Sequence, residues 1–434
     1  MHIPEGYLSP STCAVMYAAS APFWYVATQR LKGLLATRLV PLISIMAAFS
    51  FVIMMFNFPV IGGTTSHAVG IGVAATVLGP WGAIIALSVA LILQAIFFGD
   101  GGILAIGANC FNIAVAGSLV AWGIYRALAG RAPLTAPRRA LAGAVAGYLG
   151  VNVAALLTAV EVGLQPALFR DAGGAPLYAF YPLSVAVPAM MIPHLTFVGI
   201  AEALITFGVI AYLQRSDPAL LRPGAPDAGT SPAARSRRGR WRPLLIGLLA
   251  LALLSPLGLL ASGSAWGEWG ADEVVAEQAA FHLRELGDAD RAALAAELDR
   301  YAGRSADPVV AEDLRAAGAR LREGDDTGAA SLVQARIETL RAADRAEYPR
   351  IAALSDAAPE PSGLRRWGEW WSAPIPDYAP AFLRNEVAGY IISALVGGGL
   401  AIAVTWLVGR LFARPPQGDD RDPSGTPETS PSGD

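Results

Sequence analysis

The first two residues of the chain carry groups that together can chelate a transition-metal ion. The chain begins MHIPEGYLSP, and His2 is one of only four histidines in 434 residues. A terminus of the form X-His offers three nitrogens: the terminal amine, the amide nitrogen of residue two after it loses its proton, and imidazole Nδ1. This all-nitrogen set favours metals that accept square-planar geometry, Ni(II) and Cu(II) above Zn(II), with Co(II) possible. Met1 and His2 are therefore candidate metal ligands.

A fourth ligand in the same plane is still needed, and His67 is the candidate for it. It directly follows the loop IGGTTS, whose small residues would let the amino-terminal segment approach closely. Simpler interpretations stay open at this point: His2 can be an ordinary surface residue, and His67 can satisfy a buried polar contact.

The chelate requires the amine of Met1, and the start of the chain favours its retention. A cleavable signal peptide is not expected, because there is no basic leader and the apolar run 13–27 leads into Arg30 and Lys32. Removal of the initiator methionine generally needs a small second residue, and His2 is not small. We expect a free amine at Met1.

The elements that must position these residues are predicted to be transmembrane helices. Hydrophobic residues make up 54% of the chain and charged residues 15%, with a mean hydropathy of +0.45, which is typical of a multi-span membrane protein. Runs long enough to cross a bilayer, or nearly so, lie near residues 12–28, 39–56, 67–78, 81–98, 103–125, 140–160 and 182–213, and two more near 244–260 and 387–408. The run 67–78 is short, and Gly79-Pro80 predicts a sharp turn at its end.

Arginine and lysine distribution predicts the orientation of these spans. With Met1 outside, the inner loops contain nearly all the basic residues, including seven arginines between Gln214 and Arg242, and the outer loops before residue 213 contain only Arg170. We therefore expect the amino terminus and the loop before His67 to face outward, the carboxyl terminus to lie in the cytoplasm, and the protein to reside in the cytoplasmic membrane.

The predicted fold is an all-α integral membrane protein: a seven-span helical bundle plus two further transmembrane helices that flank an outward helical module. The expected units are the metal-binding bundle 1–213, a cytoplasmic Arg/Pro/Gly-rich linker 214–243, a two-span accessory unit 244–410 with an extracytoplasmic module 265–383, and a disordered tail 411–434. Mixed charge and regular apolar spacing predict helices within the module. The phrases WGEWG and WGEWW near its two ends are typical of an interfacial aromatic belt, and a docking contact is the alternative.

Four stretches in order resemble the CbiM/NikM family, the substrate-binding S components of energy-coupling-factor (ECF) importers for cobalt and nickel. They are MHIPEGYLSP, GGTTSHAVGIGVAATVLGPWGA, QAIFFGDGGILAIGANCFNIAVAG and PHLTFVGIAEALIT. From residue 244 onward the two-span layout and SPLGLLASGSAWGEWG resemble the accessory CbiN/NikN part that is often fused to the S component.

This resemblance implies a site and partners. The Met1 amine, the His2 amide and imidazole, and the His67 imidazole would hold Co(II) or Ni(II) as the transported substrate, for cobalamin biosynthesis or nickel enzymes. An ECF T component (CbiQ/NikQ-like) and ABC ATPase subunits (CbiO/NikO-like) would supply the energy. The sequence has no G-x-x-x-x-G-K-[ST] stretch, which is consistent with ATP hydrolysis by partners. Neither an organic cofactor nor a nucleic-acid partner is predicted, and lipid surrounds the spans.

Other polar residues in apolar surroundings are candidates for supporting roles. A second layer around the ligands, or groups that couple conformational changes, could come from Thr65, Ser66, Asn109, Asn112, His194 and Glu202. Ordinary interhelical hydrogen bonding is the alternative, and we favour it for Asn112. For His194 and Glu202 we favour packing or conformational coupling over a role as ligands. Gln94, Asp100 and Glu161 stand near outward helix ends, where they can line the access to the site.

Two other functional classes stay open beside an importer. A metal-dependent membrane enzyme would need further catalytic groups, but no H-E-x-x-H stretch occurs and one site would use up the histidine supply. A membrane metal sensor would use the same ligands without transport partners, and only those partners distinguish it from an importer.

Overall fold

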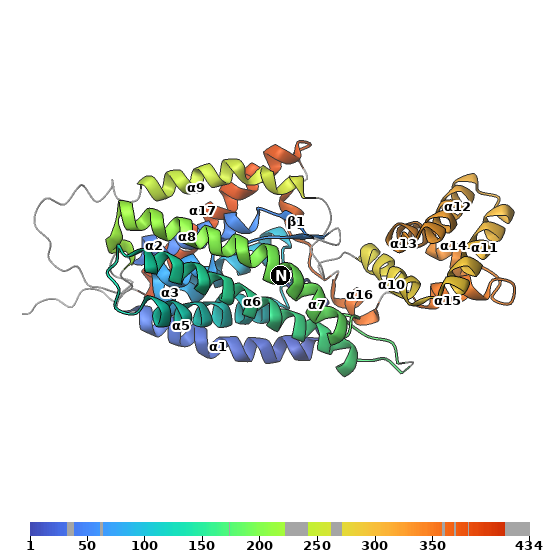
Figure 1. Cartoon of the computed structure of the whole chain (residues 1–434), viewed down its shortest axis with the longest axis horizontal. Coiled ribbons are helices and arrows are strands. Elements are labelled where there is room, and N and C mark those ends of the chain that lie inside the picture. The colour runs from blue at the N-terminus through green and yellow to red at the C-terminus, as the bar shows by residue number, and fades with distance from the viewer. Residues whose placement is uncertain are drawn as a thin grey trace, which may run out of the picture.

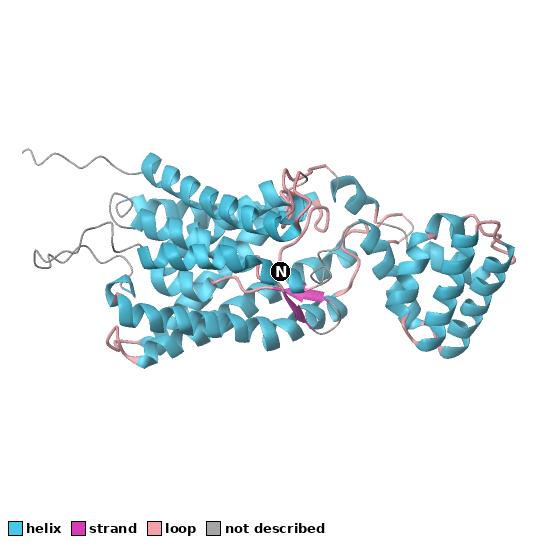
Figure 2. Cartoon of the chain, turned by 90° about the horizontal axis from the view of Figure 1, so that it is seen from above, coloured by secondary structure: helices cyan, strands magenta, loops and turns pink. Residues whose placement is uncertain are grey.

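The computed structural model describes residues 1–32, 39–60, 64–172, 174–221, 242–261, 271–357, 361–368, 370–380 and 382–412. The predicted linker between 222 and 241, the first WGEW phrase, Glu369 of the second and the tail beyond 412 lie outside these ranges. The described residues form two helical bodies, with the amino terminus inside the larger one, toward the smaller (Figures 1 and 2).

The larger body contains the membrane-type helices. They are α1 (Pro10–Lys32), α2 (Leu39–Met54), α3 (Ile71–Leu93), α4 (Ile106–Asn109), α5 (Ser118–Ala129), α6 (Pro137–Leu168), α7 (Leu183–Pro193), α8 (Gly199–Ser216), α9 (Arg242–Leu254) and α17 (Glu386–Phe412). π-Helical turns extend α3 at Gln94–Phe98, join α4 to α5 at Cys110–Gly117 and join α7 to α8 at His194–Val198; 3-10 turns follow at Pro218–Leu221 and Ser255–Leu260. Strands β1 (Phe58–Val60) and β2 (Thr64–Ser66) pair antiparallel, with Phe58 opposite Ser66.

Helix α3 is broken at Gly79, where φ is 72° and ψ is 175°, a conformation that favours glycine. A straight helix of this length would be about 34 Å long. Yet the residues flanking both ends of α3 meet at one place, because the His2 side chain contacts both His67 and Asp100. The chain therefore turns back at Gly79-Pro80, where the sequence predicted a turn.

By length and composition, six helical segments in the described ranges can cross a membrane: Ile71–Phe98, Ile106–Ala129, Pro137–Leu168, Leu183–Ser216, Arg242–Leu260 and Glu386–Arg410. Val40–Met54 is a shorter apolar helix, and α1, an expected first span, is not among the six. The single segment Ile71–Phe98 contains most of both expected runs, 67–78 and 81–98. Several helices make this a membrane protein, and the arrangement of seven plus two spans stays a prediction.

The part after α9 returns to the larger body. Helix α17 packs along α2, and α9 packs against both. Before α17, the chain passes through α16 (Ser362–Gly368) and the 3-10 turn Pro376–Tyr378. Leu364 donates its backbone N–H to the Leu177 carbonyl, and the Gly6 backbone lies against α16. The two halves of the chain thus share an interface near the amino terminus.

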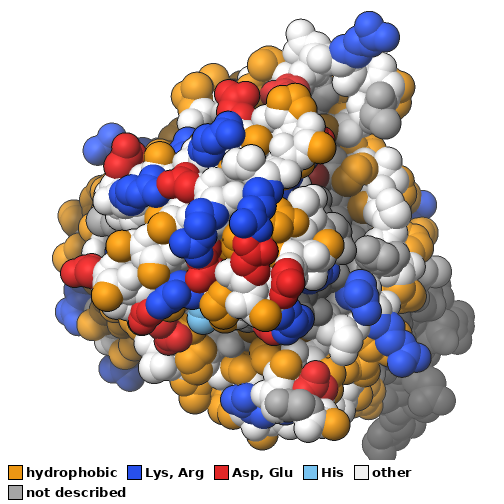
Figure 3. Space-filling model, turned by 90° about the vertical axis from the view of Figure 1, so that its right-hand side faces the viewer, with side chains coloured by type: hydrophobic (Ala, Val, Ile, Leu, Met, Phe, Trp, Pro, Cys, Tyr) orange, Lys and Arg blue, Asp and Glu red, His pale blue; other side chains and the backbone are white. Residues whose placement is uncertain are grey.

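The smaller body is the helical module that the sequence predicted. It consists of α10 (Ala271–Glu285), α11 (Asp288–Arg304), α12 (Pro308–Glu323), α13 (Asp326–Ala335), α14 (Ile337–Arg341) and α15 (Pro349–Ala357) around its own apolar core. Asp307 caps α12 by accepting from the backbone N–H of Val309 at 2.9 Å. Charges of both signs cover the outer end of the module (Figure 3). Its helical structure is confirmed.

Candidate metal centre

His2 and His67 lie side by side in the interior of the larger body. Their rings stack with centroids 5.1 Å apart and planes 24° apart. Only 2% of His2 and 4% of His67 is exposed. The interpretation of His2 as a surface residue is therefore wrong, because the amino-terminal segment is folded into the bundle.

Hydrogen bonds to its backbone and to Glu5 hold this segment in place. The backbone N–H of Ile3 donates to Asn109 Oδ1 at 2.8 Å, and Asn109 Nδ2 donates to the Ile3 carbonyl at 3.1 Å. The Glu5 carboxylate accepts from the backbone N–H of Ile103 at 2.5 Å. Gly102 is required here, because a Cβ at this position would lie 2.7 Å from the Glu5 backbone. Asn109 thus acts on the segment that carries His2.

The two ring nitrogens of His67 have different surroundings. Its Nδ1 lies 3.1 Å from the carbonyl oxygen of Ala68, which favours the tautomer with hydrogen on Nδ1. Its Nε2 is buried and has no hydrogen-bond partner among the described residues, so the lone pair on this atom is available to a ligand. Burial, the positive amino terminus and His2 lower the pKa of His67 well below its ordinary value.

Glu202 positions the chain just after His67. Its carboxylate accepts from the backbone N–H groups of Val69 and Gly70, both at 2.9 Å, and of Gly72 at 3.1 Å. These groups stand at the amino-terminal end of α3, where N–H groups have no partner within the helix. Glu202 therefore caps α3 from another helix, α8, and stabilises the turn that presents His67.

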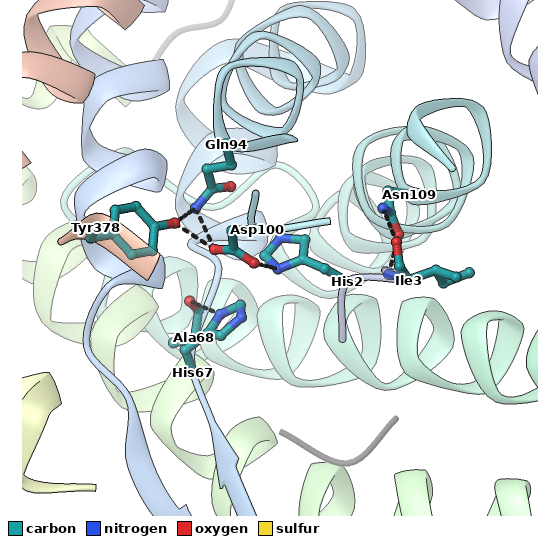
Figure 4. A network of polar contacts seen from close by, with 8 residues as sticks. All are labelled: His2, Ile3, His67, Ala68, Gln94, Asp100, Asn109 and Tyr378. Carbon is teal, nitrogen blue, oxygen red and sulfur yellow. Dashed lines mark hydrogen bonds and ion pairs between the residues drawn. The ribbon is translucent and has the colours of Figure 1, made fainter. Parts of the chain in front are cut away.

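Asp100 forms the acidic side of the cluster (Figure 4). Its Oδ1 lies 2.6 Å from His2 Nδ1, and its Oδ2 accepts from the hydroxyl of Tyr378 at 2.5 Å and from Gln94 Nε2 at 3.3 Å. Burial alone would raise the pKa of Asp100, but the charge and hydrogen bond of His2 hold that pKa well below its usual range. Burial and the Asp100 charge raise the pKa of Tyr378 well above its ordinary value.

The other residues that the sequence singled out either precede His67 directly in the chain or make polar contacts elsewhere. Thr65 and Ser66 belong to β2, directly before His67, and are buried. Asn112 instead donates to Thr158 and Glu161, and Nδ1 of His194 lies 2.7 Å from the Met190 carbonyl oxygen. The structure therefore associates Asn109 and Glu202 with the segments that carry the two histidines, and Asn112 with a separate polar contact.

Sequence reasoning gave Asp100 only a minor place and did not single out Tyr378. An acidic residue among glycines in FGDGG, at an expected outer helix end, was the available signal for Asp100. Tyr378 is 278 residues away from Asp100, and no pattern marked it. Within the described ranges no three His, Cys, Asp or Glu side chains form a group that could hold a metal ion.

Comparison with known proteins identifies the relatives of this chain. The family model CbiM, described as the cobalt uptake substrate-specific transmembrane region, matches residues 2–220. The fused nickel transport protein NikMN of Rhodobacter capsulatus is 47% identical over 403 residues, covering 93% of this chain and 95% of that protein. The probable fused nickel transport protein LarMN of Lactiplantibacillus plantarum is 44% identical over 285 residues, covering 65% and 82%. A crystal structure of a truncated transition metal transporter is 53% identical and covers 50% of this chain and 99% of its own, with a TM-score of 0.47.

These relatives and the apolar helices define the class: the chain is a membrane transport protein and not an enzyme. It belongs to the CbiM family, with a NikN-like part fused behind the substrate-specific region.

Proposed function

We propose that the chain is the S component of an ATP-driven ECF importer and binds Ni(II) or Co(II) at its extracytoplasmic face. The observation that carries this proposal is the buried, stacked pair of His2 and His67 beside the amino terminus. The names of the family and of the fused relatives, which mention cobalt uptake and nickel transport, support the choice of ions.

In the proposed site, four nitrogens surround the ion in one plane. The amine of Met1, the amide nitrogen and Nδ1 of His2, and the imidazole of His67 are the donors. Met1 is buried, as are His2 and His67. The available Nε2 of His67 is the natural fourth donor. Four nitrogen donors suit Ni(II) most directly, and the protein can impose the same geometry on Co(II).

Transport then requires partners and movement. We propose that seven spans form the S component, that the amino terminus faces outward, and that a T component and two ATPase subunits in the cytoplasmic membrane drive release of the ion inside. The positive-inside distribution of arginines supports this orientation. The fused part adds two spans and carries the module on the outer side.

Calorimetric titration of the purified chain with Ni(II) and Co(II) tests the site. The wild-type chain should bind one ion, and His67→Ala should lose most of the affinity, because it removes a ligand. Asn112→Ala is the matched control: it also changes a buried polar side chain, but one that does not contact the histidines. Equal affinity of His67→Ala and wild type would rule out the proposed ligand set.

Co-purification tests the transport role separately. Expressed with its neighbouring genes, the chain should bring down a membrane T component and ABC ATPase subunits. Metal binding without any such partner would favour a metal sensor instead. Metal content of cells lacking the gene, measured for both ions, would show which ion is transported.

A further inference from the structure

Tyr378 connects the fused carboxyl-terminal part to the candidate metal site. Its hydroxyl donates to Asp100 Oδ2 at 2.5 Å, and the other oxygen of Asp100 lies 2.6 Å from His2 Nδ1 (Figure 4). Gln94 Nε2 donates to the Tyr378 hydroxyl oxygen at 2.9 Å and so completes the network. We propose that Tyr378 is a positioning residue of the metal site, which holds the Asp100 carboxylate beside the nitrogens that would bind the ion. This inference rests on the proposed function.

The surroundings of Tyr378 hold its ring firmly. The ring stacks on Phe98, with centroids 4.9 Å apart, and meets Phe51 and Tyr390 edge-on at 6.0 and 5.6 Å. Ser393 donates to the Tyr378 carbonyl at 2.8 Å. The φ angle of Tyr378 is 60°, a region that bulky residues rarely adopt and that persists only where neighbours enforce it. Tyr378 is thus a fixed donor to Asp100 rather than a mobile side chain.

The charge of the bound ion explains why Asp100 needs a fixed position. A divalent ion on a deprotonated amide keeps one net positive charge, and the Asp100 carboxylate would balance it at short range. In the structure Asp100 contacts Nδ1 of His2, the atom that the chelate uses. Ion binding has to replace this contact with a bond from His2 Nδ1 to the ion. Because Tyr378 and Gln94 hold the Asp100 carboxylate, it keeps its position beside the ion when the contact with His2 is lost.

Tyr378→Phe removes only the hydroxyl, and Tyr390→Phe makes the same change at a neighbouring ring whose hydroxyl donates to the Met55 carbonyl instead. Titration of the full chain with Ni(II) should show roughly 10-fold or greater loss of affinity for Tyr378→Phe, within the range of about 10- to 100-fold found for outer-layer partners of metal ligands. Tyr390→Phe should bind like wild type.

A double-mutant cycle distinguishes positioning through Asp100 from a general structural effect. If Tyr378 acts through Asp100, the variant that combines Tyr378→Phe with Asp100→Asn should bind no more weakly than Asp100→Asn alone. Additive losses would overturn the inference, and so would a folded Tyr378→Phe variant with wild-type affinity. If Tyr378→Phe does not fold, Ser393→Ala replaces it in the cycle, because this change removes only the hydrogen bond to the Tyr378 backbone. A loss of Ni(II) affinity in Ser393→Ala that disappears in the Asp100→Asn background supports the inference. Wild-type affinity of Ser393→Ala overturns it.

The wild-type titration separates the two proposals. If the wild-type chain binds neither Ni(II) nor Co(II), the proposed function fails and this inference fails with it. If wild type binds and Tyr378→Phe binds equally well, only the inference fails.

Discussion

At the residue scale, hydrogen bonds to its backbone hold the amino-terminal segment beside His67. Asn109 makes two of them, both to the backbone of Ile3. Because they act on the backbone next to His2, their loss should affect the ligand geometry directly.

Asn109→Ala should therefore weaken Ni(II) binding by about 10-fold or more, since the buried N–H of Ile3 loses its acceptor at a cost of about 1–3 kcal/mol. Isothermal titration of Asn109→Ala beside wild type checks this. Asn112→Ala is the control and should leave affinity unchanged. Equal effects of the two substitutions would contradict the assignment of Asn109 to the amino-terminal segment.

At the element scale, close approach of loops brings the ligands together. The backbone at Gly102 lies against Glu5, and the end of α3 after His67 depends on a carboxylate from α8.

Gly102→Ala should displace the amino-terminal segment, because a Cβ at 2.7 Å from backbone atoms of Glu5 has no room. We expect a large loss of Ni(II) affinity in a folded protein, measured by titration. Gly123→Ala adds the same methyl group in α5, where the new Cβ would meet no atom of another element within 4 Å. It should leave Ni(II) affinity unchanged. Unchanged affinity of Gly102→Ala would show that the segment lies elsewhere.

Glu202→Ala should destabilise the bundle, because three buried backbone N–H groups lose their acceptor. A cost of about 2 kcal/mol or more is expected from unsatisfied buried donors. Thermal unfolding in detergent measures it, with Thr196→Ala, an exposed residue of the adjoining π-helical turn, as the control. An unchanged unfolding temperature would mean that these groups find other acceptors.

At the scale of the whole molecule, the chain has separate apolar cores in the bundle and in the helical module. Glu297 serves only the module: it is 2% exposed and accepts from the backbone N–H groups of Arg350 and Ile351.

Glu297→Ala should loosen the module by about 2–4 kcal/mol and leave metal affinity unchanged, because its partners Arg350 and Ile351 belong to α15 of the module. Hydrogen exchange of the full chain, with a parallel Ni(II) titration, checks both parts. A parallel loss of affinity would show that the module shapes the site.

Much of this organisation could be predicted from the sequence. Apolar runs gave most of the helices, Gly79-Pro80 gave the turn, and the X-His terminus together with one internal histidine gave the candidate ligands. Tyr378 could not be found, because a tyrosine in a proline-rich loop carries no periodic signal and its contact depends on how α17 packs along α2. Glu202 had a signal as an intramembrane carboxylate, but only the fold showed that it caps α3.

The most direct test of the central claim is to measure Ni(II) affinity after one alanine is placed before Met1. Tight binding should be lost, because the terminal amine moves away from the chelate while His2 and His67 remain in the chain. Wild-type Ni(II) affinity of the chain with the added alanine would contradict the proposed chelate.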